Sequence, residues 1–234
     1  MDVSHLRFYA EPFTTAESSW PADVRRRMKK RSQQVVMKRL GWWRMPAFAW
    51  HFAKAHKFTK SLNLAELRAR GLDNQTFIAT QLEYLAFFIA IKELVGRDEA
   101  VEIASEVMEA SAYEPMLLCL PTQEDVRATG QPFEVMTEYM RAMPAAGEQG
   151  GSHVMSVTED TPNAFEFDVT WCVWLELAKL AGVPEACIPN CHADDLVFPD
   201  YFGDLDISYK RTKTLACGGD CCDFRFERGC SKAQ

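Results

Sequence analysis

The sequence lacks any apolar run long enough to cross a membrane. Its longest such run, Tyr84 to Ile91, stops at Lys92, whereas a spanning helix needs roughly 20 apolar residues. The opening residues show no basic patch followed by an apolar stretch, so no secretory signal is indicated. We therefore expect a cytoplasmic protein with no membrane partner, whose eight cysteines stay reduced.

Internal repeats, low-complexity segments and a bias toward Gly or Pro are also missing, so nothing indicates a repeat protein or a disordered chain. With 234 residues, 47% of them hydrophobic, the chain can bury one sizeable core. We expect a single domain over residues 1–234. Within it, residues 1–20 are expected to form an extended segment, 21–145 a helical half and 150–230 a sheet-containing half.

The net charge of −7 conceals a basic run, with six basic residues among the seven from Arg25 to Arg31. On a helix, one side carries Val24, Met28, Val35 and Val36, and most of the charges lie around the rest. Aromatic residues do not interleave with the charges, as they do on many single-stranded nucleic-acid surfaces. The run is interpreted as a solvated helix face, so nucleic acid is not an expected partner, and a nucleic-acid or membrane surface is the alternative.

The helical half shows several segments with helical spacing and recognisable ends. Residues 21–41 begin with Pro and end with Gly, as helices often do. Residues 73–96 enter through Asp and Asn and are apolar on every side, which predicts a central buried helix. Two more helices are expected over 97–112 and 131–143.

The period changes after a stretch of small residues at 144–152. Alternating apolar residues predict strands over 153–157 and 164–171, followed by a helix that stops at Gly182. Residues 205–216 and 222–228 predict two hairpin strands around a glycine turn. The fold class is therefore α+β, with an N-terminal helical half packed on a C-terminal antiparallel sheet.

The closing segment carries two adjacent cysteines. Neighbouring residues of a strand point to opposite faces, so Cys221 and Cys222 cannot face the same pocket. Cys222 shares its face with Phe224 and Phe226 and should point inward, whereas Cys221 joins the face of Asp223. A small buried hydrophobe is one interpretation of Cys222, and a reactive thiol is the other.

A second cluster contains Cys191, His192, Asp194 and Asp195. If this segment is helical, Cys191 and Asp194 share a face and His192 points elsewhere. A thiol beside an acid suits nucleophilic catalysis. A polar loop with capping aspartates is the alternative.

Zinc is a further alternative for the thiols. Cys187 with Cys191 and Cys217 with Cys221 form two pairs with three residues between the cysteines, a spacing within the range of structural zinc sites. The tighter pair with two intervening residues is absent, and the helical half provides a core that needs no metal. We therefore expect no metal and no cofactor.

The last third of the chain resembles the L-2-amino-thiazoline-4-carboxylic acid hydrolase family and, more distantly, vinyl-reductase-type small-ligand domains. The likeness rests on a strand that ends at Cys172, a helix that closes at Gly182, a Cys191-x-x-Asp194 segment and the closing RTKTLACGGDCCDFRF. It implies a cofactor-independent hydrolase that opens a small cyclic amidine or amide at a C=N or C–N bond, with thiols in the site. The alternative function is a non-catalytic small-ligand or zinc sensor.

This resemblance implies that Cys191, Asp194 and Cys222 are the catalytic residues, with Cys172 and Asp223 as further candidates in the site. Either Cys191 or Cys222 would attack the amidine carbon of a small-molecule substrate, and a nearby acid would protonate the leaving nitrogen. The other cysteines of the two spaced pairs, Cys187, Cys217 and Cys221, lie outside the pattern.

A substrate carboxylate would also need a local cation, because the chain is negative overall. Arg211 is our candidate for a bidentate clamp on that carboxylate, and His192 is a second candidate contact. The sequence is also compatible with a homo-oligomer.

Overall fold

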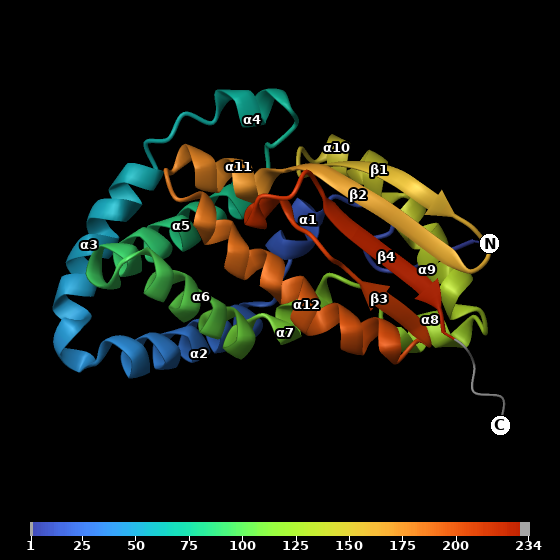
Figure 1. Ribbon diagram of the computed structural model, residues 1–234, viewed down its shortest axis with the longest axis horizontal. Coiled ribbons are helices and arrows are strands. Elements are labelled where there is room, and N and C mark those ends of the chain that lie inside the picture. Colours follow the sequence, from blue (N-terminus) through green and yellow to red (C-terminus); the bar gives the residue numbers. More distant parts are fainter. Residues whose placement is uncertain (1, 230–234) are drawn as a thin grey trace.

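The computed structural model describes residues 2–229 and consists of a helical half and a sheet that meet along helix α12 (Figure 1). The α-helices are α1 Phe13–Ser18, α2 Ala22–Leu40, α3 Met45–Thr59, α4 Ala65–Ala69, α5 Gln75–Val95, α6 Arg97–Ser111, α7 Tyr113–Leu118, α8 Gln123–Ala128, α9 Pro132–Arg141, α10 Met143–Gln149, α11 Val173–Leu180 and α12 Cys187–Gly203. Short 3-10 helices are η1 Trp42–Arg44, η2 Pro184–Ala186 and η3 Leu215–Cys217. The strands are β1 His153–Asp160, β2 Ala164–Cys172, β3 Ile207–Lys210 and β4 Cys222–Arg228. The predicted α+β class is confirmed.

Helix α5 is the central buried helix that the sequence predicts. It begins where the side chain of Asn74 accepts a hydrogen bond of 3.0 Å from the backbone N–H of Phe77. It ends at Gly96, whose positive φ of 87° favours glycine. Most of its surface is buried, because α3, α6 and α11 pack around it, while Ala79 and Glu83 are exposed along one face.

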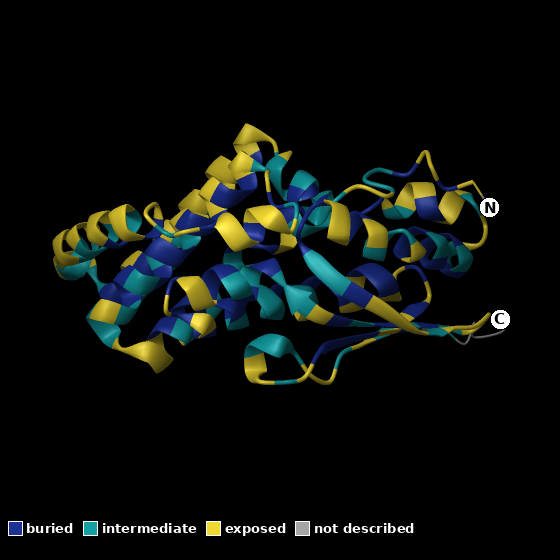
Figure 2. Ribbon diagram, turned by 90° about the horizontal axis from the view of Figure 1, so that it is seen from above, coloured by how far each residue is buried: buried dark blue, intermediate teal, exposed yellow. Residues whose placement is uncertain are grey.

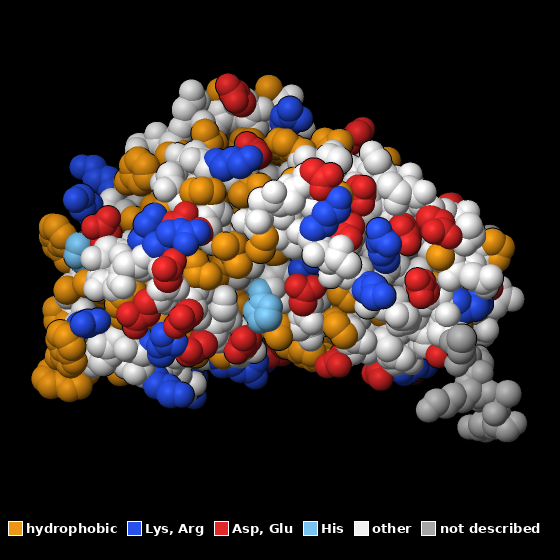
Figure 3. Space-filling model, viewed as in Figure 1, with side chains coloured by type: hydrophobic (Ala, Val, Ile, Leu, Met, Phe, Trp, Pro, Cys, Tyr) orange, Lys and Arg blue, Asp and Glu red, His pale blue; other side chains and the backbone are white. Residues whose placement is uncertain are grey.

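The basic run forms part of α2, as expected. Val24 and Val36 are buried, while the charged residues between them face outward. The solvent-facing side chains include Trp42 and Trp43, which lie at the corner between α2 and α3. Figure 3 shows hydrophobic atoms gathered at this end of the molecule, whereas acidic and basic side chains are interspersed over the rest of the visible face.

The four strands form one antiparallel sheet in the order β1-β2-β4-β3. The inward faces of β2 and β4 meet through stacked rings, with the centroids of Phe167 and Phe224 only 5.0 Å apart. Helices α9 and α12 supply the residues packed against this face. Figure 2 shows how the buried positions lie toward the interior and the exposed positions lie on the outer surfaces of the helices.

The predicted hairpin strand over 205–216 is too long. The strand β3 ends at Lys210, and residues 211–221 form an irregular connection that contains η3. The reason is Asp223, whose carboxylate accepts hydrogen bonds of 2.9 and 2.7 Å from the backbone N–H groups of Thr212 and Lys213. Since these donors are bound by a side chain, they do not continue the strand ladder.

Within residues 2–229, no helix combines the length and the apolar character that crossing a bilayer requires.

Residues 1–20 are not simply extended, because they contain helix α1. Helix α1 packs against α5. This packing places the N-terminal segment beside a cavity between the helical half and the sheet.

Candidate active site

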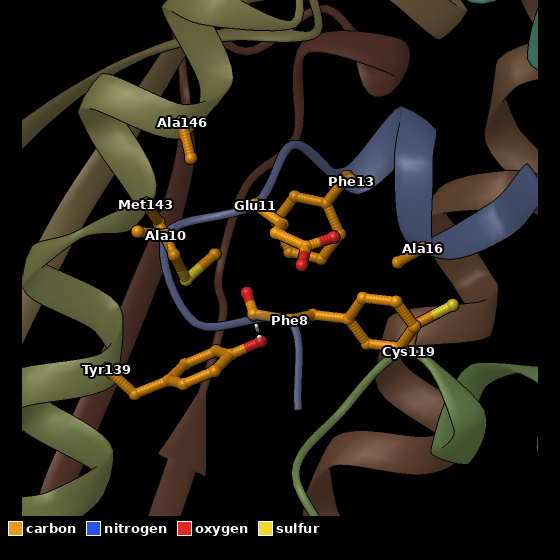
Figure 4. Close-up of a pocket in the computed structure, with 9 residues that line it drawn as sticks. All are labelled: Phe8, Ala10, Glu11, Phe13, Ala16, Cys119, Tyr139, Met143 and Ala146. Atoms are coloured by element: carbon orange, nitrogen blue, oxygen red, sulfur yellow. Dashed lines mark hydrogen bonds between the residues drawn. The ribbon is translucent and has the colours of Figure 1, made fainter. Parts of the chain in front are cut away.

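A cavity of about 330 Å³ lies between the helical half and the sheet. Its walls come from helices of both halves of the chain, including α1, α5 and α12, and from the strands β1, β2 and β4. A second cavity of only about 10 Å³ adjoins it and shares Phe13, Cys119, Tyr139 and Met143. Figure 4 shows the N-terminal segment around this small cavity, where the Tyr139 hydroxyl donates a hydrogen bond to the carbonyl of Phe8.

Four thiols form a chain at one wall of the large cavity. Cys172 ends β2, Cys187 is the first residue of α12, Cys191 lies one turn later and Cys222 begins β4. The thiol of Cys187 forms hydrogen bonds with Cys172 and Cys191, and the thiol of Cys222 forms one with Cys191. The fold therefore unites Cys191 with Cys222, but it also adds Cys187, which the sequence pattern left out.

The environment of Cys191 favours its thiolate. Hydrogen bonds from the thiols of Cys187 and Cys222 outweigh burial and lower the pKa of Cys191, and the nearby charge of Arg211 acts in the same direction. The pKa of Cys222 is raised, because its proton is held in the hydrogen bond to Cys191 and burial opposes ionisation. Cys191 lines the cavity, whereas Cys222 lies behind it.

Cys172 is a second thiol with a lowered pKa. Its causes are the hydrogen bond from Cys187, a contact with His153 and the backbone N–H of Leu175 at the start of α11. Cys187 has only one thiol proton, so it can serve either Cys172 or Cys191 at a given moment. Because Cys222 is a second donor to Cys191, its hydrogen bond lowers the pKa of Cys191 in both arrangements.

Asp194 lies one helical turn after Cys191 and also lines the cavity. Burial raises its pKa to about 7, although Arg211 opposes this shift. Arg211 Nη1 lies 2.8 Å from Asp194 Oδ2, and Arg211 Nη2 lies 2.7 Å from Asp195 Oδ2. The site thus places an acid that holds its proton near neutral pH beside a stabilised thiolate.

Arg211 does not face the cavity as a clamp for a substrate would. Its side chain is only 2% exposed and is absent from the cavity wall. Besides Asp194 and Asp195, its guanidinium binds the backbone carbonyl of Cys191 at 2.5 Å and lies over the ring of Phe224. Arg211 is therefore a residue that fixes Asp194 and the Cys191 turn of α12.

His192 and Asp223 also lie away from the cavity. His192 points outward from α12, and its Nε2 lies 3.3 Å from Glu109 Oε1. Asp223 faces the connection after β3 instead, where burial would raise its pKa but the hydrogen bonds from Thr212 and Lys213 lower it. Neither side chain is placed to contact a molecule bound in the cavity.

Two polar residues of the cavity, Glu17 and His153, were not predicted from the sequence. Burial raises the pKa of Glu17 to about 8, although the hydrogen bond of 3.1 Å from Gln81 opposes this, and both Asp194 and Cys172 lie close enough to raise it further. No sequence signal marks Glu17, because it lies in the segment expected to be extended.

His153 reaches the site through the sheet. It is paired with Cys172 in the register of β1 and β2, so the ends of these strands bring the two side chains together. Its ring stacks on Trp174 with a centroid distance of 4.8 Å. Nδ1 is buried, and no group within residues 2–229 forms a hydrogen bond with it. A bound molecule or a water would satisfy this nitrogen.

The two spaced cysteine pairs do not come together. Cys217 is exposed, and Cys221 is buried on the opposite face of β4 from Cys222, beside Lys213 and Asp168. The sequence predicts Cys221 among charged residues, and its neighbours are charged, but it is not solvent-facing. In the described part of the chain, no three or more His, Cys, Asp or Glu residues are arranged to hold a metal ion.

These features define an α+β protein with a thiol-lined cavity between its helical half and its sheet. The model of the L-2-amino-thiazoline-4-carboxylic acid hydrolase family matches residues 78–226, and the chain belongs to this family. The match runs from α5 to β4, so it includes His153 and all four thiols but leaves out Glu17. No curated protein and no solved structure matches the chain. The family resemblance is confirmed, while the more distant likeness to vinyl-reductase-type domains gains no support.

Proposed function

We propose that the protein is a thiol-dependent hydrolase that opens a cyclic amidine, with Cys191 as the nucleophile and Asp194 as the general acid. The observation that carries the proposal is the pairing of these two side chains on one face of α12, at the wall of the cavity. A thiolate and a protonated carboxyl are the two forms that such a reaction needs. The description of the family as hydrolases supports the same reaction type.

In the first step, the Cys191 thiolate forms a C–S bond to the amidine carbon. The π electrons of the C=N bond move to the ring nitrogen, which takes the proton of Asp194. The ring C–N bond then breaks as the exocyclic amino group forms C=NH. The proton that this group loses reaches the leaving nitrogen through the Asp194 carboxylate. The opened substrate stays attached to Cys191.

Water completes the cycle. It adds to the same carbon, the bond to the Cys191 sulfur breaks, and a carbamoyl-type product leaves. The overall change consumes one water and restores both the thiolate and the Asp194 proton. His153 lines the cavity, and its buried Nδ1 lacks a partner among the described residues, so it is the group best placed to orient this water.

A carboxylate beside a thiol would normally disfavour the thiolate. Here that repulsion is reduced in two ways. Burial raises the pKa of Asp194 to about 7, so below that pH the carboxyl group is mostly protonated and uncharged. The cation of Arg211 also lies against both residues, through Asp194 Oδ2 at 2.8 Å and the Cys191 carbonyl at 2.5 Å.

The test is a ring-opening assay with 2-aminothiazolines, followed by mass spectrometry of the product. Cys191→Ala should abolish turnover, and Asp194→Asn should reduce it strongly while the fold is kept. A trapped adduct on Cys191 during turnover would support the covalent step. If the wild-type protein binds amidines but never opens them, it is a ligand-binding sensor and the proposal is wrong. Reduced thiols are required, which fits the cytoplasmic location that we propose.

A further inference from the structure

The cavity has much more room than a small polar ring requires. Its volume is about 330 Å³, whereas a single water needs only about 15 Å³ of such space. An aminothiazoline ring with one carboxylate would occupy the thiol wall and leave most of the cavity empty. The empty part indicates which further groups the substrate carries.

Most of the cavity wall is apolar and adaptable. Seven of the ten methionines of the chain line it, among them Met108, Met116 and Met140. Aromatic rings from the sheet, including Phe167 and Phe226, complete the wall. Methionine side chains fill irregular space and adapt to flexible apolar ligands. A wall of this kind favours an alkyl or aryl body over a hydrated group.

The hydroxyl groups of the wall are already bound to the protein. Ser32, Thr80, Ser111 and Tyr139 each donate their hydroxyl proton to a backbone carbonyl. The other polar side chains of the wall include His153 and Glu17, which interact with Cys172, and Asn190, which lies between Cys187 and Cys191 on α12. The cavity is therefore polar at the thiol wall and apolar elsewhere.

A carboxylate on the substrate finds no lysine or arginine among the described residues of this wall, and the imidazole of His153 lies close to the thiols of Cys172 and Cys191. No Lys or Arg is among the described residues that line the cavity, while two acids, Glu17 and Asp194, do line it. Arg211 is buried behind the wall and binds Asp194 and Asp195. An anionic group would be repelled whenever either acid is ionised, whereas a neutral or cationic amidine would not be.

We infer that the substrate of this site is a cyclic amidine that carries an apolar body in place of the carboxylate. This inference rests on the proposed function and specifies its substrate class. The amidine meets Cys191 and Asp194 at the thiol wall, and the apolar body fills the methionine-lined part. Two features select this substrate: the described wall residues include no Lys or Arg, and the apolar space is large.

The experiment compares 2-aminothiazolines that carry a 4-carboxylate, a 4-methyl, a 4-butyl or a 4-octyl group. KM should fall about fourfold for each methylene added, the change that corresponds to about 0.8 kcal/mol of burial, until the cavity is full. The carboxylate compound should be the poorest substrate. If it has the highest kcat/KM, or if chain length has no effect, the inference is wrong while the hydrolase proposal stands.

A binding measurement separates the two failures. Each compound is tested for protection of Cys191 against iodoacetamide, read by peptide mass spectrometry. If no compound is opened but the octyl compound still protects at much lower concentration than the carboxylate compound, the hydrolase proposal fails and the ligand class stands. If no compound protects and none is opened, both fail.

Two variants test where in the cavity the apolar body of the substrate binds. Met108→Trp and Ala112→Phe add bulk at lining positions on α6 and directly after its last residue, in a segment that carries none of the four thiols of the thiol wall. Both should abolish the advantage of the octyl compound over the methyl compound. Ala49→Phe makes the same change as Ala112→Phe at an exposed position of α3 and serves as the control. If Ala112→Phe does not fold, Met108→Trp decides, and an unchanged octyl advantage in a folded variant overturns the inference.

Discussion

Replacing Cys222 by Ala should raise the pKa of Cys191 and move its reaction with electrophiles to higher pH. The thiol of Cys222 is one of two that hydrogen-bond the Cys191 sulfur. A hydrogen bond to a charged group contributes about 1.5–3 kcal/mol, and one pKa unit corresponds to about 1.4 kcal/mol. Loss of this donor should therefore raise the pKa of Cys191 by about 1 to 2 units.

The assay is the rate of alkylation of Cys191 by iodoacetamide as a function of pH, followed residue by residue with mass spectrometry. Only the thiolate reacts, so the midpoint of the rate profile reports the pKa. Cys222→Ser keeps a hydroxyl donor and should shift the midpoint less. Cys221→Ala is the matched control, because Cys221 is also buried but lies on the other face of the strand.

Stability should change little in Cys222→Ala, by about 1 kcal/mol, since only one small buried group is removed. Melting curves of all three variants check this point. If the midpoint for Cys191 is the same in Cys222→Ala and wild type while both are folded, Cys222 is an ordinary core residue. Its hydrogen bond would then contribute nothing to the Cys191 thiolate, and the reasoning from the thiol chain would be refuted.

Four further outcomes follow from the same contacts. Arg211→Met should lower the free energy of unfolding by about 3 kcal/mol, because the carboxyl groups of Asp194 and Asp195 lose a buried partner. Urea unfolding measures this change, and Arg211→Lys should lower the free energy of unfolding by a smaller amount. The free energy of unfolding should fall as the pH rises from about 4.5 to 8. The reason is that Asp194 and Glu17, with pKa values of about 7 and about 8 in the folded protein, keep protons that the unfolded chain has released. Glu17→Gln should flatten the slope of the urea midpoint against pH. For the enzyme reaction, kcat/KM should fall as the pH rises through about 7, where Asp194 loses its proton, and this descending limb should be missing from the pH profile of Asp194→Asn. Cys217→Ser should leave both the melting curve and the alkylation of Cys191 unchanged, because Cys217 is exposed and lies outside the thiol chain.

Local sequence patterns predicted much of the fold because local physical chemistry determines those elements. The capped apolar segment around α5 and the alternation along β4 need no information from distant residues. The connection over 211–221 was mispredicted for the opposite reason. Its alternation resembles a strand, but a carboxylate across the turn, Asp223, binds the N–H groups that a strand would use.

The candidate site also combines contacts that local sequence determines with contacts that depend on tertiary packing. Cys191 and Asp194 are three apart on one helix, so the helix alone places them together. Cys187, His153 and Glu17 join them only through tertiary packing. The contact of His153 with Cys172 depends on the register of β1 and β2, and that of Glu17 depends on the docking of α1 on α5. Register and docking are set by the packed core, which no local spacing encodes.

The apolar wall accounts for both the proposed recognition and the proposed chemistry. Burial is the first cause of the raised pKa values of Asp194 and Glu17. The same exclusion of water strengthens the hydrogen bonds that hold the Cys191 thiolate, because their electrostatic energy increases as the local dielectric falls. A substrate whose apolar body fills the cavity would keep water out during the first step, whereas a small polar substrate would leave the cavity wet. An apolar ligand would thus favour both the protonated form of Asp194 and the hydrogen bonds to the Cys191 thiolate. The turnover rate should therefore increase with the size of the apolar body.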